Sequence, residues 1–549
     1  MKNVLFFLLC LNFIQSFAQS NCDTVTNRIL MMGDSWSSIP LGFSTFEQNL
    51  DRFGYPNIGM YSNTTDLSIN GAVTSDFLTP AGKSAVQTAL LANPTIEIVN
   101  LSIGGNDALN NWNNSMDSLT TDSLLDAIMA RVDSIIDFIH SVNPSLKVFI
   151  PGYDFANFGE VIQTHFSPTS HLFYSRWNAM GQPDFIEMNK LLTKASDKFA
   201  VLANASSLVY YNNSLGLMQY LHGQTTPLGV APGGTYPPFS VPFPGGRMDY
   251  PTPKIRMNDY IILKDCFHLN FEGYDEFYQY HFEQYYWDYL RGKVDVSFVS
   301  EGNQKDGGIS SSSIITGGNV AIGNNSTLGN SKGVVSFNTS GISAASVIHR
   351  ADLFLHRDNQ TGILPSFSKA LLEVKNGFFG TSSTLEIGDF NSASSAKDTA
   401  CVYGTVSENG YWLRINVPPS LLPHISNTGT TQFRVSMTDT TDGNMIYFST
   451  GDSLNKPFMD VEYLNPTQLT ENKKSFNPIL FPNPTSGNQI ELGNTEGFKG
   501  EIIAIDLTGR VVPLTYNSSH IDVSNLVKGA YFIVLSDQKK KATIKFIKL

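Results

Sequence analysis

The chain contains a serine, an aspartate and a histidine whose residue types and spacing could support hydrolysis by a serine nucleophile. Ser35 follows the apolar run 29–32 and a glycine, and Asp265 and His268 lie three residues apart far downstream. A serine hydroxyl is a weak nucleophile and needs a neighbouring base. His268 would accept its proton and later pass it to a leaving group. Asp265 would hold the imidazole in the tautomer that presents a free nitrogen to Ser35.

Two further stretches place glycine and asparagine at turns that follow strand-like segments. Gly71 ends the stretch that begins at Ser68, and Asn106 stands in a Gly-Gly-Asn-Asp turn after the run 96–101. A glycine lets the backbone approach a ligand closely, and asparagine is a donor without charge. In an open parallel sheet, ligands bind beyond the carboxyl ends of the strands, which would place Ser35 at the mouth of a cleft.

Together these blocks resemble the SGNH, or GDSL-type, hydrolases, in the order of that family and over residues 25–292. The resemblance implies a three-layer αβα fold with a parallel sheet, and an acyl-enzyme formed on Ser35. It implies catalysis by Ser35, Asp265 and His268. It also implies an oxyanion hole made by the backbone amides of Ser35 and Gly71 and by the side-chain amide of Asn106.

Each residue also has a plain structural interpretation, and one position departs from the family. Ser35 could be an ordinary helix-capping residue, and Asp265 and His268 a cap and a surface histidine. Gly71 and Asn106 could be plain turn residues. Trp36 stands where the family pattern has leucine, and we expect the indole to narrow or line the acyl pocket.

Alternating strands and helices are predicted for the region 25–292. Apolar residues recur at helical spacing over 124–139, Asn143-Pro144 ends that pattern, and 146–150 reads as a strand. Such alternation favours a parallel sheet covered by helices. The aromatic stripe of the helix expected at 271–289 is interpreted as core or as a domain contact. The Pro- and Gly-rich loop 225–253 is either a functional rim or a passive insertion.

The N-terminus and the cysteines indicate export. Residues 1–18 have the pattern of a secretory signal peptide, and its apolar stretch is too short for a transmembrane anchor. Its removal takes Cys10 and leaves Cys22, Cys266 and Cys401. That count predicts no disulfide framework and no zinc site, and a Cys22–Cys266 pairing stays open. The net charge of −12 argues against nucleic acid and anionic membranes as partners. The mechanism calls for no metal or cofactor.

Two all-β regions are predicted to follow. Short alternating segments over 295–465 favour an antiparallel β-sandwich that is similar to DNRLRE-type accessory modules; we expect a spacer or stalk rather than a sugar-binding domain. Residues 472–549 combine a Pro-Asn-Pro opening (482–484), an Asp-x-x-Gly turn (506–509) and a Gly-x-Tyr-Phe strand (529–532). They resemble the type A C-terminal sorting domain of type IX secretion, which implies export by that machinery across the outer membrane. The tail is commonly removed or exchanged for a surface anchor.

The sequence therefore predicts a secreted or surface-attached ester hydrolase that is not an integral membrane protein. A β-rich accessory region on an exported enzyme favours acetyl groups on polysaccharides as the substrate. Lipid or phospholipid acyl esters are the alternative. A catalytically silent surface adhesin that keeps the blocks as scaffold is the third hypothesis.

Overall fold

The computed structural model describes residues 22, 24–260, 263–315, 319–325, 329–362, 368–404, 408–437, 443–464, 479–481, 483, 485–493, 500–506, 511–517, 520–536 and 541–548. The predicted signal peptide at 1–18, the two prolines of the Pro-Asn-Pro opening and the turn residues 507–509 lie outside the described residues. The chain divides into two compact units. One is Met1–Ala344 with Ile348–Tyr463, and the other is Ala345–Val347 with Leu464–Leu549.

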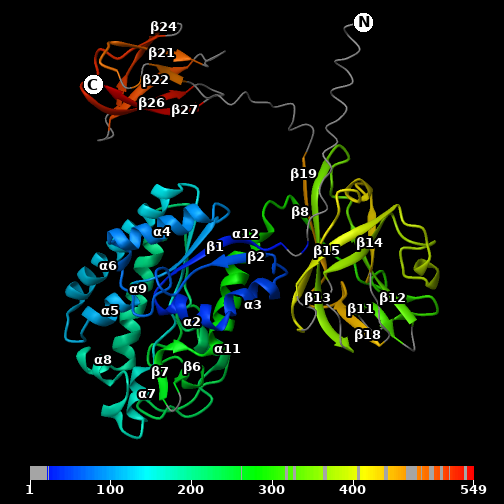
Figure 1. Ribbon diagram of the computed structural model, residues 1–549, viewed down its shortest axis with the longest axis horizontal. Coiled ribbons are helices and arrows are strands. Elements are labelled where there is room, and N and C mark those ends of the chain that lie inside the picture. The colour runs from blue at the N-terminus through cyan, green and yellow to red at the C-terminus, as the bar shows by residue number, and fades with distance from the viewer. Residues whose placement is uncertain are drawn as a thin grey trace. The chain divides into compact units, whose positions relative to one another are not determined.

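A five-stranded sheet organises the N-terminal half of the first unit (Figure 1). Its spatial order is β2-β1-β3-β4-β5, and all four strand pairings are parallel. The predicted α/β class with a parallel sheet is confirmed. The strands are β1 (Thr26–Gly33), β2 (Ile58–Tyr61), β3 (Ile98–Ser102), β4 (Lys147–Pro151) and β5 (Val209–Asn212).

Helices cover both faces of this sheet. The long ones follow the predicted pattern: α6 contains the whole 124–139 stripe, and α9 opens with an Asp184–Glu187 capping box. The helices are α2 (Ser35–Phe43), α3 (Thr45–Arg52), α4 (Pro80–Ala92), α5 (Gly105–Asn111), α6 (Ser118–Val142), α7 (Phe158–Gln163), α8 (Tyr174–Ala179), α9 (Phe185–Asn204), α10 (Leu217–His222), α11 (Phe271–His281) and α12 (Trp287–Arg291).

Alternate residues of β1 enter two different cores. Leu30 and Met32 pack with aliphatic side chains of α4, α6 and α9, whereas Ile29 and Met31 pack with α3 and α11. Successive side chains of a strand point to opposite faces, so one strand serves both layers. In Figure 1, α4, α6 and α9 accordingly lie on one side of the sheet, and α3 and α11 on the other.

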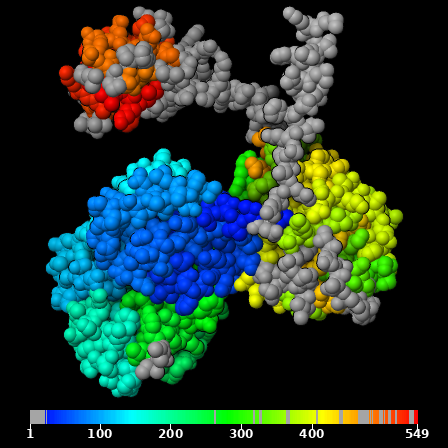
Figure 2. Space-filling view, viewed as in Figure 1, coloured from blue at the N-terminus to red at the C-terminus, as the bar shows by residue number. Residues whose placement is uncertain are grey.

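The second face is built from interlocking aromatic rings. Phe46 of α3 makes edge contacts with Tyr278, Phe282 and Tyr286, which lie on α11 and on the π-helical turn Phe282–Tyr286 between α11 and α12. Segments far apart in the sequence thus lie side by side, and the dark blue and green surfaces adjoin in Figure 2. The aromatic stripe is core, as one of its two interpretations predicted.

The β-rich region of the first unit is all-β, as predicted. The strands pair in the order β10-β9-β12-β11-β18-β13-β16-β15-β14-β17. Because β17 also pairs with β12, the strands from β12 to β17 in this order form a closed ring. β19 pairs with β13 and β8. The strands are β8 (Val296–Val299), β9 (Gly307–Ser310), β10 (Ile314–Ile315), β11 (Asn319–Asn325), β12 (Gly329–Asn338), β13 (Val347–Thr361), β14 (Lys369–Asn376), β15 (Ala396–Tyr403), β16 (Trp412–Asn416), β17 (Thr430–Met437), β18 (Asn444–Ser449) and β19 (Phe458–Leu464).

The α/β region and the β-rich region are held together by specific contacts. The Arg414 guanidinium donates to the Gly54 carbonyl and the Asn57 side chain and lies over the Tyr55 ring. Trp287 of α12 contacts rings of the β-rich region. The predicted stripe therefore serves as a domain contact as well as core.

A disulfide ties the N-terminal residues to β15. Cys22 pairs with Cys401, 379 positions away, a bond that the cysteine count did not predict. The open Cys22–Cys266 pairing does not form. Cys266 is a free, buried cysteine in the aliphatic core. Burial raises the pKa of its thiol well above the usual value, so it is a neutral core side chain.

The second unit consists of two four-stranded sheets, and its all-β class is confirmed. One sheet holds β20 (Ile479–Phe481), β21 (Gln489–Gly493), β25 (His520–Asp522) and β24 (Thr515–Asn517); the other holds β23 (Val511–Pro513), β22 (Glu501–Asp506), β26 (Gly529–Ser536) and β27 (Lys541–Lys548). Across the described residues of both units, no helix combines the length and apolarity needed to cross a membrane.

Candidate active site

Ser35 begins α2 directly beyond the carboxyl end of β1. The turn is pinned on both sides, because the Gly33 amide donates to Leu67 O (2.8 Å) and the Asp34 amide to Ser102 O (2.8 Å). Gly33 has φ +138°, and a Cβ there would lie 1.8 Å from Ser102 O, so only glycine fits. Asp34 caps α2 by accepting from the Trp36 amide at 2.9 Å. The backbone therefore sets the position of the serine.

The structure brings Ser35, His268 and Asp265 together. The Ser35 hydroxyl lies 2.7 Å from His268 Nε2, and His268 Nδ1 lies 2.7 Å from Asp265 Oδ2. One tautomer satisfies both contacts: Nδ1–H donates to the carboxylate, and Nε2 accepts from the hydroxyl. All three residues are buried. The order hydroxyl, imidazole, carboxylate is the arrangement that activates a serine nucleophile.

Asp265 and His268 lie on β7 (Leu263–Leu269), which pairs with β6 (Met257–Tyr260). The ladder is irregular there: Lys264 pairs with Asp259, and Leu269 with Met257. The residues between them bulge away from the ladder. In a regular strand, positions i and i+3 face opposite sides, so the bulge permits the Asp265–His268 contact. Asp265 Oδ1 supports it by accepting from the His268 amide at 3.1 Å.

Of the three residues predicted to supply oxyanion donors, Ser35 and Asn106 line one cavity, and Gly71 does not. Asn106 lines the same cavity as Ser35, and its side-chain amide donates to Ala72 O at 3.1 Å. An asparagine amide has two N–H donors, so one remains for an oxyanion. Gly71 adjoins Ala72 but does not line the cavity. Its φ is +80°, and a Cβ there would meet nothing within 4 Å, so backbone conformation rather than close approach accounts for glycine here.

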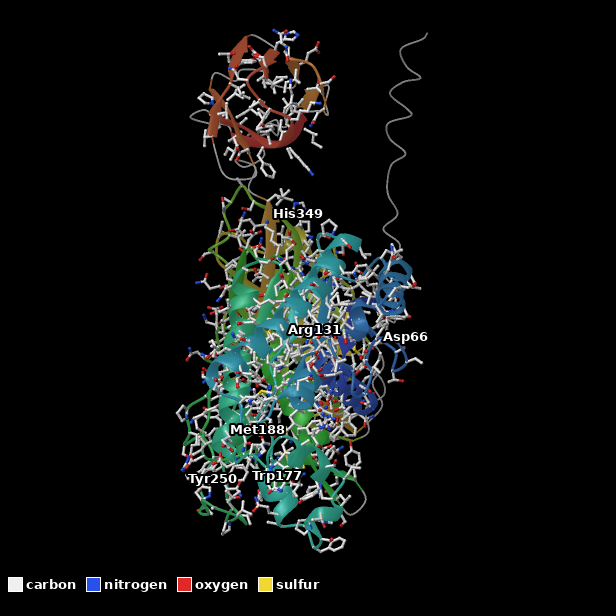
Figure 3. The ribbon with its side chains drawn as sticks, turned by 90° about the vertical axis from the view of Figure 1, so that its left-hand side faces the viewer. Asp66, Arg131, Trp177, Met188, Tyr250 and His349 are labelled. Atoms are coloured by element: carbon white, nitrogen blue, oxygen red, sulfur yellow. A yellow bond between two sulfur atoms is a disulfide. The ribbon has the colours of Figure 1, made fainter. Side chains whose placement is uncertain are left out.

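A buried network that sequence reasoning missed joins these two loops. Asp107 accepts from the amide and the hydroxyl of Thr74 at 2.8 and 2.6 Å. Arg131 of α6, labelled in Figure 3, contacts both Thr74 and Asp107. The network holds the segment after Gly71 against the start of α5. A carboxylate directly after Asn106 was the available sequence signal.

Sequence reasoning also missed a contact between Asp34 and Tyr153, next to the nucleophile. The Tyr153 hydroxyl donates to Asp34 Oδ2 at 2.7 Å and accepts from the Gly105 amide at 3.2 Å. Burial raises the pKa of the Asp34 carboxyl to about 6, although the bonds from Tyr153 and Trp36 lower it. Burial also keeps the Tyr153 phenol protonated by raising its pKa well above the usual value. No sequence signal marked Tyr153.

An apolar cavity of about 60 Å³ opens beside Ser35. It extends over the turn before α5 and between α6 and α9, where Met188 (labelled in Figure 3) is one of its lining residues. Trp36 also lines it and is fixed by edge contacts with Tyr153, Tyr274 and Phe277. None of the residues 225–253, all of which are described, lines this cavity. That loop packs instead against the start of α9.

The described residues contain no group of three or more His, Cys, Asp or Glu side chains that could hold a metal ion.

The C-terminal residues match a known family. Residues 479–549 match the model of the secretion system C-terminal sorting domain. The prediction of an export signal at this end is confirmed, and the protein is exported across the outer membrane to the extracellular space or the cell surface. No curated protein matches the chain.

Several solved structures are similar to about half of this chain. The family 3 carbohydrate esterase from Talaromyces cellulolyticus is 10% identical, covers 49% of this chain and 100% of its own, and has a TM-score of 0.30. The Clostridium thermocellum family 3 carbohydrate esterase is 17% identical (48% and 98% covered, TM-score 0.26). Phospholipase A1 from Streptomyces albidoflavus NA297 is 15% identical (48% and 99% covered, TM-score 0.25). At these values the matches assign neither activity nor substrate to this chain.

Proposed function

We propose that this protein is an exported serine ester hydrolase that forms an acyl-enzyme on Ser35. The observation that carries the proposal is the pair of 2.7 Å contacts that link the Ser35 hydroxyl to His268 and His268 to the Asp265 carboxylate. A chance cap and a surface histidine would have no reason to meet in a buried relay, 233 positions apart in the sequence.

The relay defines the proton path. His268 Nε2 takes the Ser35 proton as the hydroxyl oxygen attacks the ester carbonyl. It then gives that proton to the leaving alcohol oxygen. In the second half, His268 takes a proton from water as the water oxygen attacks the acyl carbon. It then gives that proton to the Ser35 oxygen as the acyl–oxygen bond breaks, which releases the acid and restores the serine hydroxyl. The Asp265 carboxylate orients the imidazole and stabilises the imidazolium that forms.

The tetrahedral intermediates place negative charge on the former carbonyl oxygen. We assign its stabilisation to the backbone amides of Ser35 and Gly71 and to the side-chain amide of Asn106. Donors fixed in advance are effective because they need no reorganisation during the reaction. The Thr74–Asp107–Arg131 network supports this assignment, since it fixes the loop after Gly71 relative to Asn106.

The ester that we propose as the substrate belongs to one of two classes: acetyl esters of polysaccharides or acyl esters of lipids. We further propose that the β-rich region is a fixed support for the α/β region rather than a flexible spacer, which the disulfide and the Arg414 contacts favour. Its resemblance to DNRLRE-type modules stays a prediction.

Labelling of the full mature chain with a fluorophosphonate probe tests the proposal. An activated serine reacts with the probe, and we expect Ser35→Ala to abolish labelling. Ser37 is the matched control, because it lies on the same turn but donates to the Met32 carbonyl at 3.0 Å. Ser37→Ala should keep the label. A folded wild-type protein that stays unlabelled and hydrolyses no ester would support the adhesin hypothesis instead.

A further inference from the structure

The cavity beside Ser35 indicates which substrates the site selects. We propose that it binds the acyl chain of the substrate, and that the enzyme hydrolyses esters of linear, medium-length carboxylic acids. This inference rests on the proposed function of Ser35. It departs from the polysaccharide acetyl ester that the sequence favoured.

The position of the cavity suits an acyl chain. Ser35 and Asn106 line its reacting end, and α9 lines it from Met188 to Phe199. These two positions are about 16 Å apart along a helix that rises 1.5 Å per residue. A chain whose carbonyl carbon sits at Ser35 can therefore run from the strand ends in between the two long helices.

A gap in the side-chain packing keeps the entrance open. Gly104 lines the cavity with φ +109°. A Cβ there would lie 3.2 Å from Ile128 Cγ2 and 3.7 Å from Phe199 Cζ. Ile128 of α6 and Phe199 of α9 are themselves lining residues. Any larger residue would occupy the passage between the nucleophile and the helices.

Apart from Ser35 and Asn106 at the reacting end, the polar side chains that line the cavity have their hydrogen-bond partners within the protein. The Asp154 carboxylate accepts from the amides of Phe155 (2.7 Å), Gly216 (2.7 Å) and Met218 (2.9 Å). The Tyr153 hydroxyl donates a hydrogen bond to the Asp34 carboxyl group. A sugar hydroxyl placed in the cavity would lose its hydrogen bonds to water without replacement, at a cost of about 1–3 kcal/mol each. A methylene group is favoured there.

The volume sets the chain length. One water-sized group needs about 10–15 Å³ of such a cavity, so about 60 Å³ accommodates roughly four to six groups. An acetyl group would leave most of the cavity empty, whereas a long fatty acyl chain would exceed it. With the carbonyl carbon held at Ser35, four to six further carbons correspond to pentanoyl to heptanoyl esters, so among even-numbered chains the cavity suits hexanoyl esters best.

The first experiment measures kcat/KM of the full mature protein on nitrophenyl acetate, butyrate, hexanoate, octanoate and palmitate. Each buried methylene contributes about 0.8 kcal/mol, so we expect a rise of about fourfold per methylene up to hexanoate, no further rise at octanoate, and a fall at palmitate. A profile that is highest at acetate overturns the inference and leaves the proposed function intact.

The second experiment fills the cavity. Ala195→Leu adds bulk between α6 and α9, and we expect the optimum to move to shorter chains. Ala200→Leu is the matched control, because it lies on α9 outside the lining and should keep the wild-type profile. Leu192→Ala should move the optimum to longer chains. An unchanged profile in both lining variants would contradict the inference.

A third measurement is independent of catalysis. Ser35→Ala should bind sodium hexanoate more tightly than acetate by calorimetry, and Ala195→Leu in that background should weaken hexanoate binding at least tenfold. If wild type fails both labelling and acetate hydrolysis, the proposed function falls; hexanoate binding would then still support an acyl-chain site. No hexanoate binding in a folded Ser35→Ala protein would overturn the inference.

Discussion

The two faces of one parallel sheet are packed in different ways. On the first, α4, α6 and α9 pack aliphatic and methionine side chains against Leu30 and Met32 and leave the cavity beside Ser35. On the second, α3 and α11 pack aromatic rings against Ile29 and Met31. Methionine and leucine adapt their shape to a ligand, whereas interlocked rings do not. We infer that the first face serves substrate binding and the second serves rigidity.

Trp36 connects the two faces. Its ring packs against Tyr274 and Phe277 of the aromatic face and also lines the cavity. The aromatic face continues through Trp287 to the β-rich region. Variants on the two faces should therefore separate effects on chain-length selectivity from effects on stability.

We expect the largest effect on turnover from a substitution in the relay of Ser35, His268 and Asp265. Asp265→Asn keeps the shape but favours the wrong imidazole tautomer, and we expect kcat on nitrophenyl butyrate to fall on the order of 10⁴-fold. The chain-length profile of the residual activity should not change, because the cavity is untouched. Steady-state kinetics with circular dichroism as a folding control measure this. A fall of less than tenfold would exclude Asp265 from the relay.

The next prediction compares how much a substitution on each face lowers the free energy of unfolding. Phe46→Ala removes a fully buried ring from the aromatic face and should cost about 3–5 kcal/mol of unfolding free energy in urea. Met129→Ala, which enlarges an existing cavity, should cost about 2 kcal/mol and move the preferred chain length upwards. Equal costs, or an altered chain-length profile in Phe46→Ala, would contradict the division of roles.

Asn106→Ala tests the reacting end of the aliphatic face. Loss of one oxyanion donor typically lowers kcat by about 10²–10³, and we expect that fall with KM little changed. Asn110→Ala is the control, since Asn110 lies on the same helix α5 outside this cavity. Near-normal turnover in Asn106→Ala would remove Asn106 from the oxyanion hole.

The smallest effect is a pH dependence at the rim of the cavity. The folded-state pKa of Asp34, about 6, lies above its ordinary value of 3.8, so folding favours the protonated carboxyl. Its stabilising contribution is full below pH 3.8 and is lost as the pH rises through 6. Wild type should therefore lose on the order of 3 kcal/mol relative to Asp34→Asn between pH 4 and pH 7. Urea unfolding at both pH values measures the difference, and a constant difference would show that Asp34 is not buried as described.

Local patterns accounted for much of the fold. The spacing of apolar residues over 124–139 and the runs at 96–101 and 146–150 correspond to α6, β3 and β4, because these signals depend only on near neighbours. The bulge that brings Asp265 to His268 was not predictable, since it depends on how β7 pairs with β6. Nor was the Cys22–Cys401 bond, which joins residues that only the folded chain brings together.

By itself the sequence determined the chemical groups and their order: the serine turn, the glycine and asparagine turns, the Asp265-x-x-His268 pair and the export signal at the C-terminus. The tertiary structure alone decided their distances, the Asp34–Tyr153 and Asp107–Arg131 contacts, and the cavity between α6 and α9. Residue types and periodicity are written locally along a chain, whereas a contact or an unfilled space is a property of side chains from several distant segments packed together.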